Sequence, residues 1–492
     1  MDGAQFSFFD DGTWSGKIYT GGWVDGSGGA DEVTAPADGA HVASIGRATP
    51  ADLGAAAKAA RAAQPAWEAT APADRAAILN KAAEILEANA GELIPWIIRE
   101  TGSIPPKAGI EIEHSAGFLR AAAEAAQENQ TQTLASVDGR GASEELIRVA
   151  HGVVGVISPF NFPLILSIRA IAAALATGNA VVHKPDPRTP ITGGVMIARA
   201  FEDAGLPSGL LHIVPGGADV GAAMCEDPNI AMVSFTGSPE VGAKVGEACG
   251  RNLKKVQLEL GGKNALIVMD DADIDVAASN AAWGAWLHQG QICMATGLIL
   301  VPSATAGQLI EALGTKASHL PVGDPAKEEC ALGPLIVEAE AKRVEGIVED
   351  AVAKGATLHV GGKPNGTLFP ATVLSGVKPG MRAFDEEIFG PVAVIAEYDN
   401  EDHAVELANM SDFGLVASVI GTDVRRARDL GMRLRVGHLH INDQTVTASP
   451  LAPFGGRGRS GNGCRISGPA LWEEFTQWVW VTTKPAATPY PF

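Results

Sequence analysis

Short apolar runs rich in β-branched residues alternate with amphipathic stretches through the middle of the chain. The runs are 153–157, 180–182, 211–214 and 231–235. Helical patterns begin near Pro163, Thr189, Ala218 and Ser238. Because fully apolar strands that alternate with helices are typical of a parallel sheet covered on both faces, we expect an α/β, doubly wound domain here.

The pattern changes on either side of this region. The first 130 residues contain two Ala-rich stretches with helical spacing, behind a Gly-rich segment at 21–29, and we expect them to be largely helical. A further strand near 256–260 runs into two glycines, and alternation then restarts at 265–269 and continues to about Ile441, which predicts a domain junction near Glu259.

Two outlying segments differ from the rest. Residues 127–141 are polar, and residues 475–483 alternate aromatic, polar and β-branched side chains like an exposed strand that needs a partner. We therefore expect these two segments to pair, within the chain or between subunits.

Composition narrows the possible functions. The 492 residues are 46% hydrophobic and 19% charged, as in a folded protein of several domains. The net charge of −20 argues against nucleic acid or an anionic membrane as partner. Without a leader segment or an apolar run of roughly 18 residues, we expect a cytoplasmic protein. The five cysteines form no C-x-x-C pair, so we expect free thiols and no metal site.

Two glycine-rich segments are candidates for binding phosphate. Residues 456–461 fit G-x-G-x-x-G, but a proline-containing segment precedes them instead of a strand, so we interpret them as a flexible, turn-rich loop. Residues 235–242 follow an apolar strand and open a helix at Ser238, with Pro239 in its first turn. That segment is either a phosphate site or an ordinary β-α turn.

Three side chains are candidates for chemistry. Cys293, in G-Q-I-C-M, is either a nucleophile or an inert buried thiol. Glu259, in L-E-L-G-G-K-N, is either a base whose pKa is raised by burial or a carboxylate paired with Lys263 or Lys254. Asn161, in P-F-N-F-P, is either a donor to an oxyanion or a turn residue.

The joint order of these motifs is more specific than any one of them. Along the chain come P-x-N-x-P, H-K-P, T-G-S, E-L-G-G-K-N, G-Q-x-C, E-I-F-G-P-V and P-F-G-G. From about Tyr19 to Pro485 the sequence resembles the aldehyde dehydrogenase superfamily. The resemblance implies an α/β aldehyde dehydrogenase-like fold, with a Rossmann-type cofactor domain (1–126 and 148–258), an α/β catalytic domain (259–465), and a small β oligomerisation arm and tail (127–147 and 466–492).

The resemblance also implies roles for the matching positions. Cys293 would be the nucleophile, Glu259 the base, and the Asn161 amide, with the Cys293 backbone N–H, the oxyanion hole. The cofactor would be NAD or NADP, with Lys184 at the adenosine ribose, Ser238 at the pyrophosphate, Glu387 at the nicotinamide ribose and Phe389 near the nicotinamide. The full set of expected cofactor residues is Ile157, Ser158, Pro159, Lys184, Asp186, Arg188, Gly217, Thr236, Gly237, Ser238, Gly242, Leu260, Glu387 and Phe389.

Within the superfamily, the sequence is most similar to the benzaldehyde and vanillin dehydrogenase type. The matching segments are K-P-D-P-R-T at 184–189, I-N-D-Q-T-V at 441–446 and W-E-E-F-T-Q-W at 472–478. The resemblance implies an aromatic aldehyde. As a hypothesis of our own, the residues that bind it are Phe162, Leu166, Arg169, Trp283, Ile292, Met294 and Phe454. Residues 447–451, T-A-S-P-L, depart from a usually more acidic stretch, which leaves the ring substituents open.

Coenzyme choice and rival functions remain open at this point. Pro187 stands where many NAD-preferring relatives have a glutamate, and Arg188 either binds a 2′-phosphate or pairs with Asp186 or Glu202, so we expect both NAD and NADP to be used. The alternatives are a semialdehyde or CoA-acylating dehydrogenase, a non-catalytic structural relative, and an alcohol or 2-hydroxy acid dehydrogenase. We expect a homodimer or homotetramer.

Overall fold

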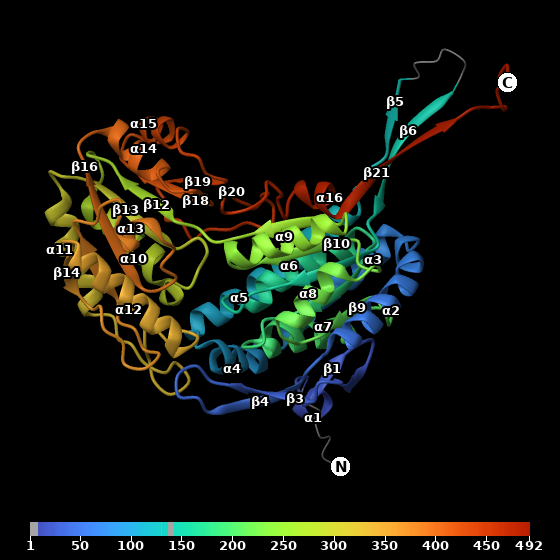
Figure 1. The fold of residues 1–492 in the computed structure, drawn as a ribbon, viewed down its shortest axis with the longest axis horizontal. Helices are drawn as coiled ribbons and strands as arrows, with labels where there is room; N and C mark the ends of the chain where they lie inside the picture. The colour runs from blue at the N-terminus through green and yellow to red at the C-terminus, as the bar shows by residue number, and fades with distance from the viewer. Residues whose placement is uncertain (1–7, 129, 136–141) are drawn as a thin grey trace.

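The computed structural model describes residues 8–128, 130–135 and 142–492, which fold around two seven-stranded sheets (Figure 1). The first sheet, in spatial order, contains β11 (Lys255–Glu259), β10 (Met232–Thr236), β7 (Val153–Ile157), β8 (Ala180–Lys184), β9 (Leu211–Ile213), β1 (Lys17–Tyr19) and β2 (Trp23–Asp25). The strands from β11 to β9 are parallel, whereas β1 pairs antiparallel with β9 and β2.

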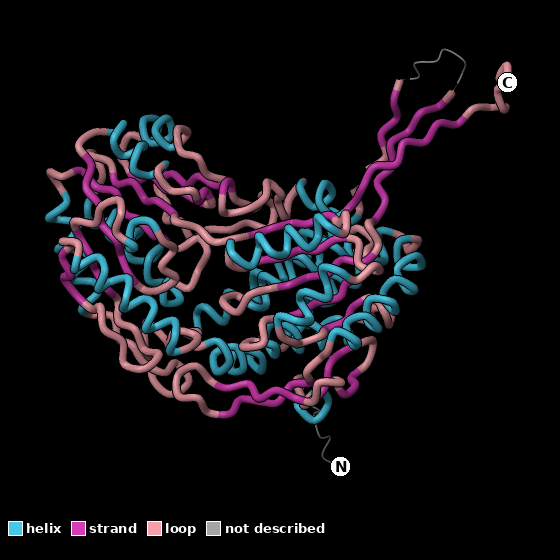
Figure 2. The backbone as a smooth tube through the Cα atoms, in the orientation of Figure 1, coloured by secondary structure: helices cyan, strands magenta, loops and turns pink. Residues whose placement is uncertain are grey.

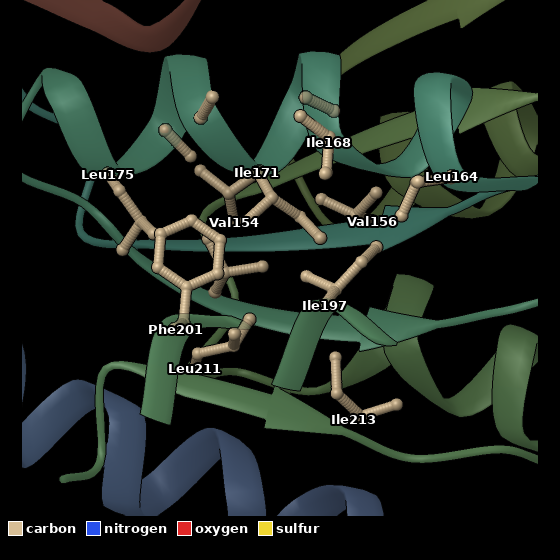
Figure 3. Packing of buried hydrophobic residues seen from close by; sticks show 14 of the residues in the cluster. Val154, Val156, Leu164, Ile168, Ile171, Leu175, Ile197, Phe201, Leu211 and Ile213 are labelled. Atoms are coloured by element: carbon tan, nitrogen blue, oxygen red, sulfur yellow. The ribbon is translucent and has the colours of Figure 1, made fainter. Parts of the chain in front are cut away.

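Helices cover both faces of this sheet. Val154 and Val156 of β7 pack against α6 (Figure 3), whereas a Cβ atom on Gly155 between them would lie 2.7 Å from Met224 of α8. Successive residues of a strand point to opposite faces, so α6 and α8 lie on opposite sides. The helices of this half are α2 (Pro50–Glu68), α3 (Pro72–Ala88), α4 (Ala90–Thr101), α5 (Pro105–Ala126), α6 (Pro163–Ala176), η1 (Ile191–Val195), α7 (Met196–Asp203), α8 (Ala218–Glu226) and α9 (Pro239–Arg251). The predicted α/β class is confirmed.

The second sheet comes from the part of the chain after Glu259. Its strands, in spatial order, are β14 (Thr357–Val360), β15 (Thr372–Ser375), β16 (Val392–Tyr398), β13 (Thr296–Pro302), β12 (Asn264–Val268), β18 (Val416–Ile420) and β19 (His438–Ile441). Its helices are α10 (Ile274–Trp286), η2 (Leu287–Gly290), α11 (Ala306–Ser318), α12 (Glu338–Ala353), α13 (Arg382–Asp385), α14 (Glu401–Asn409) and α15 (Val424–Gly431). On these two sheets we propose the domain division expected from the sequence.

A three-stranded sheet projects from the body as an arm (Figure 2). It contains β5 (Gln132–Leu134), β6 (Ser143–Ala150) and β21 (Thr476–Thr483), which follows α16 (Ala470–Phe475). Because β6 pairs with both β5 and β21, the described residues of segments 127–141 and 475–483 do not pair directly within the chain, and their pairing between subunits stays a prediction. Residues 129 and 136–141 lie outside the described residues.

Two further expectations need correction. After α1 (Asp11–Trp14), the segment up to Gly46 forms β1, β2, β3 (Ala30–Thr34) and β4 (His41–Gly46) instead of helix. The glycine-rich 456–461 segment is not a flexible loop. Its β20 (Arg457–Gly458) pairs with β17 (Phe413–Gly414), and the Ser460 carbonyl accepts a hydrogen bond from Leu260 N. Among the described residues, no helix combines the length and apolar character needed to cross a membrane.

Candidate functional site

Four parallel strands end side by side at one edge of the first sheet. The strands β7, β8, β10 and β11 end at Ile157, Lys184, Thr236 and Glu259. In the pairing register Ile157 lies opposite Lys184, and Thr236 lies opposite Glu259. Ligands of doubly wound sheets bind outside this carboxyl edge. From Glu259 the chain passes directly through Leu260 and two glycines into β12, so this edge faces the second sheet.

The second sheet presents the amino ends of its strands to the site. Cys293 precedes β13, while Glu387 and Phe389 precede β16. Asn264, which opens β12, donates from Nδ2 to the carbonyls of Cys293 and Ala295, both at 2.8 Å, and accepts from Val416 N at 3.1 Å. Asn264 therefore fixes the Cys293 loop to two strands. Sequence reasoning missed this role, although Asn264 is the last residue of E-L-G-G-K-N.

Two glycines let the backbone approach closely between the sheets. A Cβ atom on Gly262 would lie 2.7 Å from the Cys293 carbonyl oxygen, and one on Gly261 would collide with the Glu387 carboxylate. Glu387 Oε1 accepts a hydrogen bond from Gly262 N at 2.9 Å. The E-L-G-G turn thus brings Glu387 and the Cys293 loop together at the end of β11.

Asn161 lies on the other side of the Cys293 loop, just before α6. Its Nδ2 donates to the Gln291 carbonyl at 2.9 Å, and Gln291 Oε1 accepts from Ile336 N at 3.0 Å. Asn161 is buried, and the structure therefore holds its amide beside the segment that carries Cys293.

Glu259 is 2% exposed and has an arginine as its charged neighbour. Arg169 Nη2 lies 3.9 Å from Glu259 Oε2 and donates to Thr236 Oγ1 at 3.2 Å. Burial raises the pKa of Glu259 to about 8, against the opposing charges of Arg169 and Arg465. The rise expected from desolvation is confirmed, and Glu259 is poised to exchange a proton near neutral pH.

The lysines considered as partners of Glu259 bond elsewhere. Lys263 Nζ donates to the Ala383 carbonyl at 2.7 Å, and Lys254 Nζ donates to the carbonyls of Asp227 and Ile230. The interpretation of Glu259 as a lysine-paired carboxylate is therefore wrong.

The Cys293 thiol is protonated at neutral pH in this structure. Burial raises its pKa to about 12, and the charges of Glu259 and Glu387 also raise it, whereas Arg169 lowers it. The thiolate is the reactive form, so addition to a carbonyl requires a group that accepts the thiol proton. Glu259 and Glu387 are the carboxylates whose charges act on the thiol, and Glu259 is the one expected from the sequence to be the base.

The expected cofactor positions follow the same carboxyl edge. Ile157, Ser158 and Pro159 follow one another out of β7. Lys184 is buried at the end of β8 and donates to the Pro185 carbonyl at 3.2 Å. Gly217 caps α8, and Ser238 caps α9 by accepting from Val241 N at 3.3 Å.

These groups fit a dinucleotide. NAD and NADP carry ribose hydroxyls and phosphates. The donors and acceptors that match them are the Lys184 ammonium, the N-terminus of α9 after Gly237, and the Glu387 carboxylate from the second sheet. A Cβ atom on Gly242 would lie 2.5 Å from Leu260, so this glycine lets α9 pack on the segment that joins the two sheets.

Arg188 is paired with Asp186. Its Nε lies 2.8 Å from Asp186 Oδ1 and its Nη2 lies 2.7 Å from Oδ2, and the guanidinium stacks 4.2 Å from the Phe160 ring centroid. Of the pairings considered from the sequence, the one with Asp186 is therefore observed. Phe160 in turn contacts Phe389 edge to face, at 5.9 Å between centroids.

The expected substrate residues surround this junction unevenly. The Phe454 ring contacts Arg169, at 5.0 Å, and the His438 ring, at 4.6 Å. Phe162 contacts the His288 ring at 5.4 Å. Leu166 and Ile292 are buried, and Met294 is half-buried. Trp283 on α10 is 51% exposed, and its place in a pocket stays a prediction.

Comparison with known proteins gives one consistent picture. The model of the aldehyde dehydrogenase family matches residues 23–481. The chain is 48% identical to a vanillin dehydrogenase of Amycolatopsis sp., over 99% of this chain and 100% of that protein. It is 47% identical to a benzaldehyde dehydrogenase [NAD(+)] of Pseudomonas putida, over 97% and 98%. A solved salicylaldehyde dehydrogenase from Pseudomonas putida G7, complexed with salicylaldehyde, superposes with a TM-score of 0.93 at 35% identity, over 97% of this chain and 99% of that one.

Proposed function

The chain belongs to the aldehyde dehydrogenase family, and from that premise we propose that it oxidises an aromatic aldehyde to the carboxylic acid with NAD or NADP. The observation that carries this proposal is the meeting of Cys293, Glu259 and Asn161 between the two sheets, because these are a nucleophile, a base and an oxyanion donor. The relatives named above act, by their names, on vanillin, benzaldehyde and salicylaldehyde, which supports an aromatic substrate.

The first half of the reaction forms a bond to Cys293. The Sγ atom attacks the aldehyde carbon while its proton passes to a base, and the resulting oxyanion accepts hydrogen bonds from the Cys293 N–H and from Asn161 Nδ2. Asn161 must exchange its bond to the Gln291 carbonyl for this one. When bound, the coenzyme would accept a hydride from the carbon of the Cys293 adduct, and the adduct would thereby become a thioester.

The second half returns the enzyme to its starting state. Glu259 accepts a proton from a water molecule that attacks the thioester carbon, the C–S bond breaks to release the carboxylic acid, and Glu259 returns the proton to the Cys293 sulfur. The pKa of Glu259, about 8, matches this role near neutral pH. We assign the coenzyme to Lys184, the start of α9 and Glu387, in the orientation implied by the family.

A panel of aldehydes tests the substrate class. Burying a benzene ring between Phe162 and Phe454 contributes a few kcal/mol, so kcat/KM for benzaldehyde and vanillin should exceed that for acetaldehyde by about a hundredfold. NADH or NADPH absorbance measures each rate. Equal efficiencies for benzaldehyde and acetaldehyde would contradict the aromatic assignment. Product analysis with and without CoA separates acid formation from acyl transfer to CoA, and any turnover rejects the non-catalytic alternative.

We also propose that the arm makes the protein a homodimer or homotetramer. The strand β21 forms one edge of the arm, and Trp478, Val479 and Trp480 along it are exposed. An exposed edge strand rich in aromatic residues is a template for pairing with a further chain. Light scattering of the purified protein gives the subunit number, and a monomeric mass would reject this assignment.

A further inference from the structure

Two opposite charges are buried beside the Asn161 backbone. Lys107 and Glu111 lie one turn apart on α5 and are 1% and 0% exposed. Lys107 Nζ lies 2.5 Å from Glu111 Oε1. Neither side chain has a part in the reaction described above. Burying two charges carries a large desolvation cost, so an ion pair in this position calls for an explanation in its contacts.

The contacts of the pair converge on the segment that carries Asn161. Lys107 Nζ donates to the Asn161 backbone carbonyl at 2.8 Å. Glu111 Oε2 accepts from the backbone nitrogens of Leu164 and Ile165, at 3.0 and 3.3 Å. These N–H groups belong to the first turn of α6, where a helix has no internal acceptor for them. The pair therefore connects α5 to both ends of the 161–165 segment.

Lys107 also contacts Phe162, one of the expected substrate residues. Its ammonium lies 4.4 Å from the Phe162 ring centroid, and His288 meets the same ring edge to face. His288 has a left-handed backbone, with φ of 48°, and precedes Cys293 by five residues. Burial and the nearby Lys107 charge hold the His288 pKa well below its usual value, so the imidazole that faces Phe162 is neutral. Phe162 thus contacts both a cation and a neutral ring.

We propose that Lys107, held by Glu111, is a positioning residue that fixes the Asn161 carbonyl and the Phe162 ring, and thereby aims the Asn161 amide at the oxyanion. This inference rests on the proposed role of Asn161 in the reaction. Lys107 touches no reacting atom. Its effect therefore appears in the steps that form and oxidise the Cys293 adduct, and not in coenzyme binding.

A double-mutant cycle tests this inference. The paired change Lys107→Met with Glu111→Leu removes both charges together and leaves no unpaired one. It should slow single-turnover hydride transfer from benzaldehyde about tenfold or more, as misplaced catalytic groups do, with the coenzyme Kd unchanged within about twofold. If Lys107 acts through Asn161, the same change should cause no further loss in an Asn161→Ala background.

The possible outcomes are distinct. A parent-like rate in the paired variant, or losses that multiply in the combined variant, would overturn the positioning role. A parent-like rate in Asn161→Ala alone would instead reject the proposed oxyanion donor. The control is the exposed pair Lys342 and Glu338 on α12, also one turn apart, whose removal should leave the rate unchanged.

A conservative variant covers the case in which the paired change prevents folding. Lys107→Arg keeps the positive charge, but a planar, longer head group cannot hold the Glu111 carboxylate and the Asn161 carbonyl in the same geometry. Hydride transfer should slow about threefold or more while coenzyme binding and the melting temperature stay near the parent values. A parent-like rate in this variant would also overturn the proposal.

Discussion

Two buried charge pairs of the candidate site are built in opposite ways. In the rear pair, Lys107 and Glu111, the charged atoms are 2.5 Å apart, and both side chains also bond to backbone groups. In the front pair, Arg169 and Glu259, the charged atoms are 3.9 Å apart. Within the described part of the chain, Glu259 Oε1, Arg169 Nε and Asn161 Oδ1 are buried without a hydrogen-bond partner. Polar atoms left unbonded in a buried place are costly unless a function uses them.

The difference between the two pairs indicates that one holds the backbone in place and the other takes part in proton transfer. A buried ion pair in close contact holds its neighbours in one geometry, whereas a carboxylate kept apart from its arginine titrates near the working pH. Both pairs are buried, and they differ in the separation of their charges and in the hydrogen bonds that each carboxylate accepts. Substitutions of Arg169 or Glu259 should therefore alter the reaction rate with little effect on the structure.

The largest effect is expected at Cys293. Cys293→Ala should lower kcat by at least about a thousandfold, because no other described thiol is placed against Glu259 and Asn161. Coenzyme binding, measured by fluorescence titration, should persist. Cys330→Ala, in a loop of the second half, is the matched control and should retain parent activity. Turnover of Cys293→Ala within tenfold of the parent would reject Cys293 as the nucleophile.

Glu259→Gln should separate the two half-reactions. Thioester hydrolysis should slow about a hundredfold, because general base catalysis contributes this much or more. The acyl-enzyme should then accumulate and be visible by intact mass after mixing with aldehyde and coenzyme. Absence of an adduct together with unaltered steady-state turnover would show that Glu259 is not the base.

The pH dependence of hydrolysis tests whether Arg169 controls the pKa of Glu259. Glu259 works as a base when deprotonated, so the hydrolysis rate should rise as the pH increases through about 8. Arg169 lowers this pKa, and Arg169→Met should therefore move the profile to higher pH, by about one unit. Arg169→Lys keeps a positive charge and should move it less. A profile that stays in place in Arg169→Met would mean that Arg169 does not control the proton on Glu259.

Sequence reasoning located the proposed catalytic residues better than the residues that support them. The β-α alternation predicted β7 with its observed bounds, because a buried parallel strand is a continuous apolar run. The strands before Gly46 were missed because they are short; β1 and β2 have three residues each, and β3 has five and buries only Val33 fully. Such strands lack both the apolar run and a regular alternation.

The supporting residues could not be predicted for a different reason. Lys107 is 54 residues from Asn161 in sequence, and α5 shows no motif around it. A lysine and a glutamate one turn apart are ordinary on a solvated helix face, and only the packing of α5 against α6 buries them. The order of motifs therefore pointed to the residues proposed for chemistry, whereas the contacts that hold them are a property of the folded chain.

The smallest effect is expected at a pair that lies between these two extremes. Asp186 and Arg188 are in bidentate contact like the rear pair, yet their side chains are 13% and 39% exposed at the coenzyme edge. If the pair is adjustable, Asp186→Asn should remove a charge that repels a 2′-phosphate and free Arg188 to bind it, while the Phe160 ring still supports the guanidinium. We expect both coenzymes to be used by the parent, and the NADP to NAD ratio of kcat/KM to rise about fivefold in this variant, since one charge in a pair with a partly exposed partner contributes little. Arg188→Ala should lower the ratio, and the combined variant should resemble Arg188→Ala, because the gain requires the freed guanidinium. A ratio unchanged by Asp186→Asn would place this pair with Lys107 and Glu111, as a fixed support that has no part in coenzyme choice.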